Sequence, residues 1–332
     1  MLNRPDGLPE TDVAAALARE WRIDADVLDY LPVGFGSYHW RATGPGGRWF
    51  VTADDLRAKR WSAVGPPAAA WRRLRASLAT AAALREHGQA FVVAPRPAAS
   101  GDPAVRVGEA YALAVYPYLE GESFAWGDVP TAEYRRAVLG MLTALHGAPP
   151  AAAAAALPDD LAVPLRAELT AVAGGAGPAQ GHGPFGPPAA ALIHRAAGPL
   201  RRMLARYDQL TDTARRSGPA AVLTHGEPHP GNTMRTADGW RLIDWDMVLL
   251  APAERDLWWL DPGGGSTLAA YADAAGRAPR PDLLELYRLR WDLADLAEFG
   301  AQLTGPHPGH DDDAKSFGVL ESLVARAERD YG

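Results

Sequence analysis

The chain has 332 residues, of which 48% are hydrophobic and 22% are charged, a balance typical of folded rather than disordered proteins. Its formal net charge of −7 argues against nucleic acid as a partner, because phosphate backbones are bound by clustered cations, but suits a cationic ligand. The sequence contains no cysteine, which excludes disulfides, thiolate catalysis and cysteine-bound zinc. It has no apolar run long enough for a membrane span or, within 1–20, for a signal peptide, so we expect a cytoplasmic protein with no membrane partner.

The first 117 residues are predicted to form a small lobe built on an antiparallel sheet. A short amphipathic helix should come first, over 9–21. Five strands are expected after it, over 27–33, 38–43, 48–52, 91–94 and 111–116. Apolar residues at helical spacing predict one long helix over 68–87, which should end at Gly88.

Helical patterns dominate the rest of the chain. They lie over 131–147, 161–172, 189–217, 281–303 and 312–330. An alanine run over 151–156 and a glycine- and proline-rich segment over 174–188 are interpreted as surface loops. Strands followed by helices are typical of an α+β fold, so we predict two lobes, 1–117 and 118–332, with a cleft between them.

The local structure of the segment that precedes Asp244 can be predicted from its sequence. A buried strand is expected over 221–224, followed by a loop that glycines and prolines hold open. Strands over 233–235 and 240–243 should then form a hairpin. The ends of this hairpin would bring Asn232 and Asp244 together, close to Glu227.

Phosphoryl transfer needs this set of groups. A carboxylate can orient the attacking hydroxyl and accept its proton, while an asparagine oxygen and a second carboxylate hold Mg²⁺ on the nucleotide phosphates. Asp246 either reaches the metal or faces solvent. A zinc site made of His225, Glu227 and His229 has the i, i+4 histidine spacing, but these residues lie among prolines rather than on a helix, which disfavours it.

The sequence resembles the aminoglycoside phosphotransferase and choline kinase superfamily, which has a protein-kinase-like bilobal fold. The resemblance covers roughly 28–303, and its later motifs are similar to the spectinomycin phosphotransferase branch in particular. It rests on His225-Gly226-Glu227 with Asn232, Ile243-Asp244-Trp245-Asp246, Ala251-Pro252-Ala253-Glu254-Arg255-Asp256-Leu257 and Tyr287-Arg288-Leu289-Arg290-Trp291-Asp292-Leu293-Ala294-Asp295.

The resemblance implies roles for the residues of these motifs. Glu227 would be the catalytic base, and Asn232 and Asp244 would be metal ligands, with Asp246 as a further candidate ligand. His225 would support the catalytic loop, and Asp256 would hold that loop by hydrogen bonds to its backbone.

The resemblance also implies a site for ATP or GTP with Mg²⁺. The residues expected to line it are Gly34, Gly36 and Ser37 over the phosphates and Val115, Tyr116 and Tyr118 along the base.

The base position and the phosphate-binding position depart from the family pattern. Glu227 stands where the family has aspartate, and its extra methylene shifts the carboxylate by about 1 Å, a displacement that can slow catalysis. No lysine stands near Thr52, where the family holds nucleotide phosphates. Arg75 stands near the position of that lysine's glutamate partner, so this ion pair is missing as well.

The missing positive charge must come from elsewhere in the chain. The lysines are Lys59, which lies past the strand, and Lys315, which lies late in the sequence. We therefore predict that Arg41 or Arg75 contacts the phosphates, since arginine can bind them bidentately.

An acidic pocket for the acceptor is predicted at Asp261, Asp292, Asp295 and Glu298, although a solvated helix face is the alternative for the last three. The function predicted is a Mg²⁺-dependent kinase that phosphorylates a hydroxyl of an aminoglycoside- or aminocyclitol-like substrate, a reaction that can inactivate antibiotics. The alternative is a non-catalytic protein on the same fold that only binds nucleotide or another ligand, which the missing lysine and the altered base favour.

Overall fold

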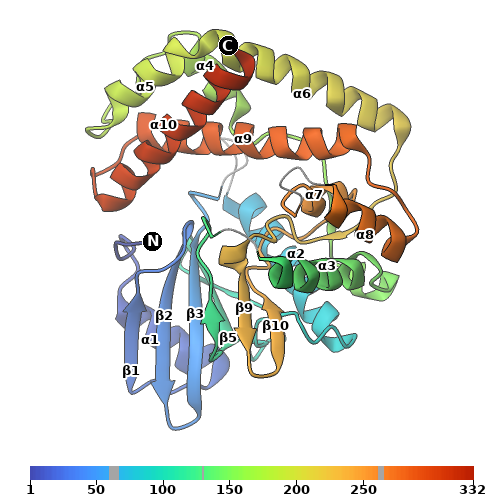
Figure 1. The fold of residues 1–332 in the computed structure, drawn as a ribbon. Helices are drawn as coiled ribbons and strands as arrows, with labels where there is room; N and C mark the ends of the chain where they lie inside the picture. Colours follow the sequence, from blue (N-terminus) through green and yellow to red (C-terminus); the bar gives the residue numbers. More distant parts are fainter. Residues whose placement is uncertain (60–66, 129–130, 261–264) are drawn as a thin grey trace.

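The N-terminal part of the chain forms a five-stranded antiparallel sheet in the order β1-β2-β3-β5-β4 (Figure 1). The structure is a computed structural model that describes residues 1–59, 67–128, 131–260 and 265–332. The strands are β1 (Val27–Leu31), β2 (Ser37–Gly44), β3 (Gly47–Asp55), β4 (Val105–Val107) and β5 (Tyr111–Pro117).

Alternation along the strands gives this sheet two unlike faces. Trp40 and Val51 are fully buried on one face, under α1 (Glu10–Ala16) and the π-helical turn η1 (Leu17–Trp21). Because side chains two residues apart share a face, Thr52 and Asp54 lie on the other one. The second face is the one that carries polar groups toward the helical lobe.

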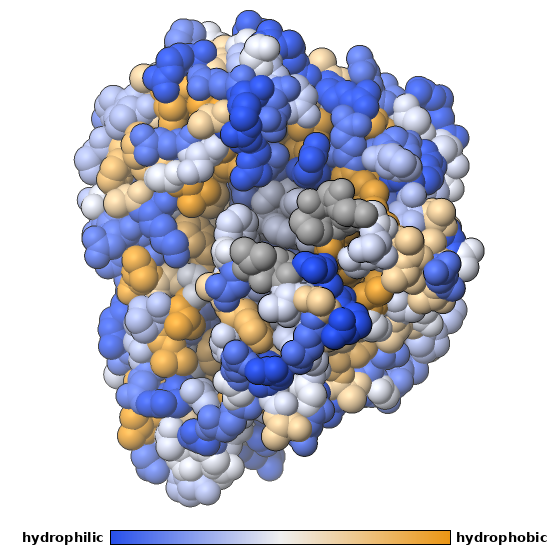
Figure 2. Space-filling view, in the orientation of Figure 1, coloured by the Kyte–Doolittle hydropathy of each residue, from blue (hydrophilic) through white to orange (hydrophobic). Residues whose placement is uncertain are grey.

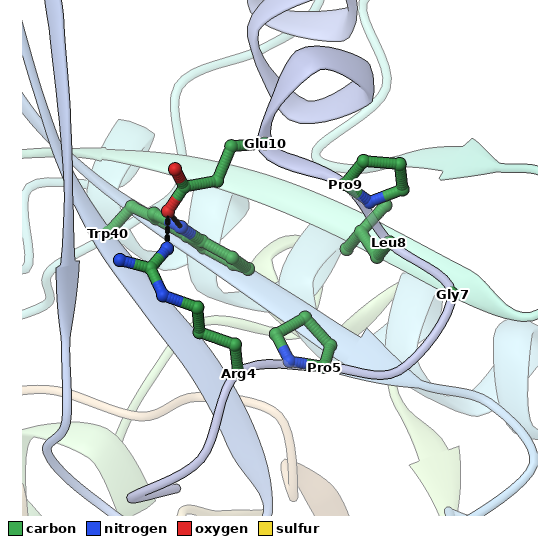
Figure 3. Close-up of a pocket in the computed structure, with 7 residues that line it drawn as sticks. All are labelled: Arg4, Pro5, Gly7, Leu8, Pro9, Glu10 and Trp40. Carbon is green, nitrogen blue, oxygen red and sulfur yellow. Dashed lines mark hydrogen bonds and ion pairs between the residues drawn. The ribbon is translucent and has the colours of Figure 1, made fainter.

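An open hollow beside the sheet is lined by the N-terminal segment and Trp40 (Figure 3). The Glu10 carboxylate accepts a hydrogen bond from Trp40 Nε1 (3.0 Å) and pairs with Arg4. Its charged groups satisfy one another, so this hollow serves the packing of the N-terminal segment.

The prediction of a strand over 91–94 in this sheet was wrong. Val92 forms a single parallel bridge with Leu242 of the helical lobe instead. The backbone bonds there run from Leu242 N–H to the Phe91 carbonyl (2.9 Å) and from Val93 N–H to the Leu242 carbonyl (3.2 Å). The fifth strand is β4, which sequence reasoning missed.

The long helix α2 (Pro67–Glu86) contributes to the cores of both lobes, which share it. Leu74 and Leu78 pack with alanines of β5. Ala81 and Leu84, one turn further on, pack with residues of the helical lobe, among them Trp245. Because α2 packs into the cores of both lobes, these contacts mark no boundary between the lobes at residue 117. That division stays a prediction.

The helical lobe contains eight α-helices and several short strands among the described residues. The helices are α3 (Ala132–His146), α4 (Arg166–Ala173), α5 (Gly186–Arg195), α6 (Ala197–Ser217), α7 (Glu254–Leu257), α8 (Ser266–Ala275), α9 (Pro281–Thr304) and α10 (Asp311–Tyr331). The strands are β6 (Glu122–Ser123), β7 (Leu157–Pro158), β8 (Val222–Thr224), β9 (Thr233–Thr236), β10 (Gly239–Leu242) and β11 (Leu249–Ala251).

Two predictions about this lobe need correction. The single helix expected over 189–217 is two helices, α5 and α6, because the Pro199 ring would clash with the carbonyl of Arg195 in a continuous helix. The alanine run expected to be a surface loop contains the 3₁₀ turn η2 (Pro150–Ala153), in which Ala152 is fully buried against α2.

The surface is mixed in character on the face that Figure 2 shows, with hydrophilic side chains over both lobes and apolar ones in scattered patches. Within the described ranges, no helix combines the length and the apolar character that crossing a membrane requires.

Candidate active site

The segment predicted to carry the chemistry forms a strand, a loop and a hairpin. β8 leads into the loop 225–231, and β9 and β10 then pair as an antiparallel hairpin. At the open end of this hairpin, the Ile243 N–H donates to the Asn232 carbonyl (2.9 Å). Asn232 Nδ2 in turn donates to the Glu227 carbonyl (3.0 Å). The hairpin therefore brings Asn232, Asp244 and Glu227 together, as predicted.

Two buried side chains hold the loop from behind. Asp256 accepts hydrogen bonds from the backbone N–H groups of His225 (2.9 Å) and Gly226 (2.6 Å), the contact expected of it. His225 Nε2 donates to the Ile243 carbonyl (2.9 Å), and its Nδ1 accepts from the Glu227 N–H (3.2 Å). Burial lowers the pKa of His225, so the ring is neutral and fixed in one tautomer. Both ring nitrogens of His225 are hydrogen-bonded to the backbone, so this side chain holds the loop in place.

Gly226 is required by the close approach of Arg255. Its φ is +104°, a backbone conformation that residues with a Cβ atom rarely adopt. A Cβ added there would also overlap the Arg255 guanidinium. Arg255 cannot easily move aside, because it donates to Thr224 Oγ1 (2.8 Å) and to the Met247 carbonyl (2.8 Å).

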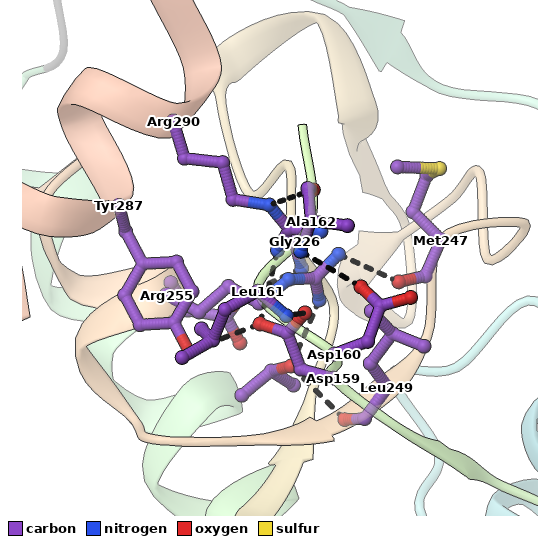
Figure 4. A network of polar contacts seen from close by, with 12 residues as sticks. Asp159, Asp160, Leu161, Ala162, Gly226, Met247, Leu249, Arg255, Tyr287 and Arg290 are labelled. Carbon is purple, nitrogen blue, oxygen red and sulfur yellow. Dashed lines mark hydrogen bonds and ion pairs between the residues drawn. The ribbon is translucent and has the colours of Figure 1, made fainter. Parts of the chain in front are cut away.

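A buried polar network continues from Arg255 toward α9 (Figure 4). Asp159 lies close enough to Arg255 to interact with its charge, and it accepts hydrogen bonds from Tyr287 Oη (3.0 Å) and Arg290 Nη1 (2.9 Å) of α9. Removing one partner of such a buried pair is strongly destabilising, so the network fixes α9 relative to the catalytic loop.

Four carboxylates and one ammonium group meet at the junction of the lobes. This carboxylate cluster consists of Asp54, Glu227, Asp244 and Asp246, with Lys59 among them. Burial, followed by repulsion from Asp246, raises the pKa of Asp244 well above its usual range, and Lys59 only partly offsets this. Burial also acts to raise the pKa of Asp246, but attraction to Lys59 leaves it lowered. The cluster carries an excess of negative charge that a divalent cation would relieve.

The oxygen donors of this cluster fit Mg²⁺ in the presence of a nucleotide. Because a carbonyl can only accept, the Glu227 carbonyl fixes the Asn232 amide with Nδ2 toward it, which leaves Oδ1 as the ligand atom. In the part of the chain that the structure describes, no group of three or more His, Asp or Glu side chains could hold a metal ion by itself. Mg²⁺ does not need one, because it keeps several waters and takes other ligands from phosphates.

Lys59 is the site residue that sequence reasoning missed. β3 ends at Asp55, whose carbonyl accepts hydrogen bonds from the N–H groups of Ala58 (3.0 Å) and Lys59 (3.0 Å). This turn folds the chain back, so that Lys59 Nζ lies 2.8 Å from Asp54 Oδ1 and also pairs with Asp246. Sequence reasoning gave Lys59 no role because it lies past the strand, and it did not foresee the turn that brings it back.

The two arginines predicted to supply the missing charge are paired elsewhere. Arg75 Nη2 lies 2.5 Å from Asp102 on the exposed side of α2. Arg41 Nη2 lies 2.7 Å from Asp29 on the neighbouring strand β1. The structure therefore brings Lys59 to the carboxylate cluster, but not Arg75 or Arg41.

The loop predicted to cover the phosphates joins β1 to β2 and reaches across to the helical lobe. Gly34 and Gly36 have φ angles of +71° and +82°, which the loop's turn requires. Ser37 Oγ donates to Asp54 Oδ1 (2.6 Å) at the end of the loop. At its tip, Phe35 lies edge-on to Phe299 of α9, with 5.5 Å between ring centroids.

Backbone groups expected to meet the nucleotide base are already used within the protein. The Val115 carbonyl accepts a hydrogen bond from the Arg96 N–H (2.6 Å), and the Tyr118 N–H donates to the Arg48 carbonyl (3.4 Å). Burial, followed by the nearby carboxylate cluster, raises the pKa of Tyr116 well above its usual range. The Tyr116 phenol therefore lies near the carboxylate cluster.

Two of the four acidic residues proposed for the acceptor lie near Glu227. Desolvation, followed by repulsion from Glu298 and Glu227, raises the pKa of Asp295 well above its usual range. Desolvation of the carboxyl group by the surrounding protein, followed by repulsion from Glu227, raises the pKa of Glu298 to about 7, although the residue as a whole keeps exposed surface. Both residues belong to α9, which thus directs two carboxyl groups at the loop 225–231.

The other two acidic residues differ from these. Asp292 pairs with Arg326 of α10 (2.7 Å), which links the last two helices. Asp261 lies outside the described residues.

Aromatic rings border the acidic groups of α9. Trp126 is 58% exposed, and its ring centroid lies 6.3 Å from that of His229 and 6.5 Å from that of Trp259. Trp259 in turn lies edge-on to Trp291 of α9, at 4.9 Å, and donates from Nε1 to the Gly226 carbonyl (3.1 Å). Flat apolar faces beside carboxylates suit a ligand that carries both a ring and a positive charge.

A small antiparallel sheet on a helical lobe, with a carboxylate-bearing loop at their junction, is the architecture of a protein-kinase-like fold. Residues 31–299 match the family model described as the phosphotransferase enzyme family. Protein StrN of Streptomyces griseus is 30% identical over 294 residues, which span 86% of this chain and 82% of StrN. The chain belongs to this phosphotransferase family.

Solved structures of small-molecule kinases share its fold. A spectinomycin phosphotransferase in complex with ADP and spectinomycin superposes with a TM-score of 0.71 at 15% identity, covering 96% of this chain and 97% of that one. An amicoumacin kinase in complex with AMP-PNP and Ca²⁺ gives 0.62 at 12% identity, covering 97% and 94%. These likenesses confirm the predicted α+β, protein-kinase-like fold.

Proposed function

We propose that the protein is a Mg²⁺-dependent kinase that transfers the γ-phosphate of ATP or GTP to a hydroxyl group of a small cationic substrate. The observation that carries this proposal is the convergence of Glu227, Asn232 and Asp244 at one end of the hairpin. Such an enzyme would act in the cytoplasm, where its nucleotide is made, and it would need neither nucleic acid nor a membrane.

Each group has a role in this proposal. Glu227 would orient the acceptor hydroxyl and take up its proton. Asn232, Asp244 and Asp246 would hold Mg²⁺, which neutralises charge on the phosphates when bound. His225 and Asp256 would keep the loop rigid, because a transfer with a loose transition state depends mainly on positioning.

The acceptor is proposed to be an aminoglycoside- or aminocyclitol-like molecule. Glu227 lies close enough to Asp295 and Glu298 to raise their pKa values, so a cation bound to these two residues would lie near the base. The neighbouring Trp126 and Trp259 would pack against the ring that carries the hydroxyl group. Phosphorylation of such a compound would be one route to antibiotic resistance.

The test is the thermal stability of the purified protein with ATP or GTP, with and without Mg²⁺, for the wild type and for Asp244→Asn. We expect a magnesium-dependent rise in Tm that the variant lacks, followed by phosphate transfer to a panel of cationic, hydroxylated acceptors. The absence of any shift at millimolar nucleotide would overturn the proposal.

The non-catalytic alternative has one observation in its favour, the glutamate at the base position. Its other support, the missing lysine, is weakened by the position of Lys59 beside Asp246. Nucleotide binding without phosphate transfer to any acceptor would decide in favour of this alternative.

A further inference from the structure

The phosphate side of the site contains an ion pair that the family pattern does not provide. β3 has Thr52 where a phosphate-binding lysine is expected, but Asp54 follows two residues later on the same face. Asp54 is only 4% exposed, and it bonds to Lys59 Nζ (2.8 Å).

The sequence after β3 is built to return Lys59 to the sheet. The Asp55 carbonyl accepts from the Lys59 N–H (3.0 Å), and the Asp55 carboxylate accepts from the Arg57 N–H (2.8 Å). Leu56 is fully buried in the N-terminal lobe and fixes the turn to the core. The short stretch 54–59 therefore supplies the acidic partner, the turn, its apolar anchor and the cation.

From these contacts we propose that Lys59 is the cation that holds the nucleotide phosphates, and that Asp54 is its positioning partner. The inference rests on the proposed function, because it assigns a role within the same nucleotide site. An ammonium group has three N–H donors. Asp54 and Asp246 take two of them, and the third is left for a phosphate oxygen.

The charges around Lys59 support this role. Lys59 pairs directly with Asp54 and Asp246, so carboxylates face its ammonium group from both the sheet and the helical lobe. Without Lys59, nucleotide phosphates entering the carboxylate cluster would meet repulsion from its acidic groups. Lys59 also lies between Asp54, which binds Ser37 of the phosphate-covering loop, and Asp246 beside the metal ligands. It thereby connects the two walls of the site.

The experiment compares the affinities for MgATP, MgADP and adenosine by calorimetric titration. Lys59→Ala should weaken MgATP binding about 10- to 100-fold, the loss expected for charged hydrogen bonds, and leave adenosine binding within about twofold. Lys59→Arg should restore part of the MgATP affinity, and Asp54→Asn should lower it less than Lys59→Ala does. Arg75→Ala, whose guanidinium pairs with Asp102, is the matched control and should bind all three ligands as the wild type does.

A second variant guards against misfolding of Lys59→Ala, which would leave the carboxylates without a counter-charge. Lys59→Ala combined with Asp54→Asn removes one charge of each sign, and we expect it to melt near the wild-type Tm while it still binds MgATP weakly. Unchanged MgATP affinity in Lys59→Ala or in the double variant would overturn the role of Lys59, and so would an equal loss of affinity for adenosine. The proposed function would be unaffected by these results. Failure of the wild-type protein to bind any of the nucleotides would overturn the proposed function, and this inference with it.

Discussion

The two walls of the candidate site are built in different ways. On the helical side, the groups lie within one stretch of sequence, 225–256, and a single hairpin and its supporting aspartate bring them together. On the sheet side, Ser37 lies opposite Asp54 on the neighbouring strands β2 and β3, and Lys59 returns to Asp54 through the turn after β3. The first wall is set by a hairpin and its support, and the second depends on a strand pairing and on the path of the chain after β3. The predictions below test how rigidly the first wall is set and how sensitive the second is to charge.

The largest effect is expected at Glu227. If the loop is shaped around a glutamate, Glu227→Asp withdraws the carboxylate and should lower kcat about 100-fold, although aspartate is the family's own residue. Glu227→Gln removes the base and should lower kcat about 1,000-fold. Steady-state kinetics of both variants, with the Tm as a control for folding, measures this. A faster Glu227→Asp enzyme would show that the loop is not adapted to glutamate.

A smaller effect, on stability, is expected at Gly226. Gly226→Ala combines a strained φ with an overlap on Arg255, and it should lower the free energy of unfolding by about 3 kcal/mol. The matched control is Gly239→Ala, where φ is +105° but the nearest atom, Arg241 Nη1, lies 3.9 Å from an added Cβ. Chemical denaturation of both variants separates the two contributions. Equal losses would mean that Arg255 yields without cost.

The smallest effect is expected in the pH dependence of Glu298. Its pKa is about 7 in the folded protein, above the ordinary 4.5, so the folded state binds more protons and stability falls as pH rises from about 4.5 to 7. Glu298→Gln should flatten this part of the curve, whereas Glu321→Gln, on the exposed surface of α10, should not.

The same ionisation should affect acceptor binding. KM for a cationic acceptor should fall as pH rises through about 7, and Glu298→Gln should raise KM about fivefold at pH 8 with little change at pH 6. A KM that is independent of both pH and this substitution would remove Glu298 from the acceptor site.

The accuracy of the sequence predictions follows the same division. The hairpin around Asn232 and Asp244 was predictable because turn residues and strand patterns lie side by side in the chain. The position of Lys59 was not, because it depends on how the chain turns after Asp55.

A distant partner explains one of the other errors in the predicted fold, and a single proline explains another. The apolar run at Val92 has the pattern of a sheet strand, yet its partner is Leu242, far away in the sequence. The apolar periodicity continues through Ala196, and only the Pro199 ring shows that the helix must break.

The sharing of α2 between two cores has a consequence for how the molecule unfolds. Leu74 and Leu78 belong to one core and Ala81 and Leu84 to the other, so neither core can be lost without exposing apolar surface of the same helix. The lobes should therefore melt in one cooperative transition, and a fragment cut at residue 117 would carry half of a helix interface with nothing to cover it. Stabilisation gained by a ligand on the sheet side is then transmitted to the whole chain.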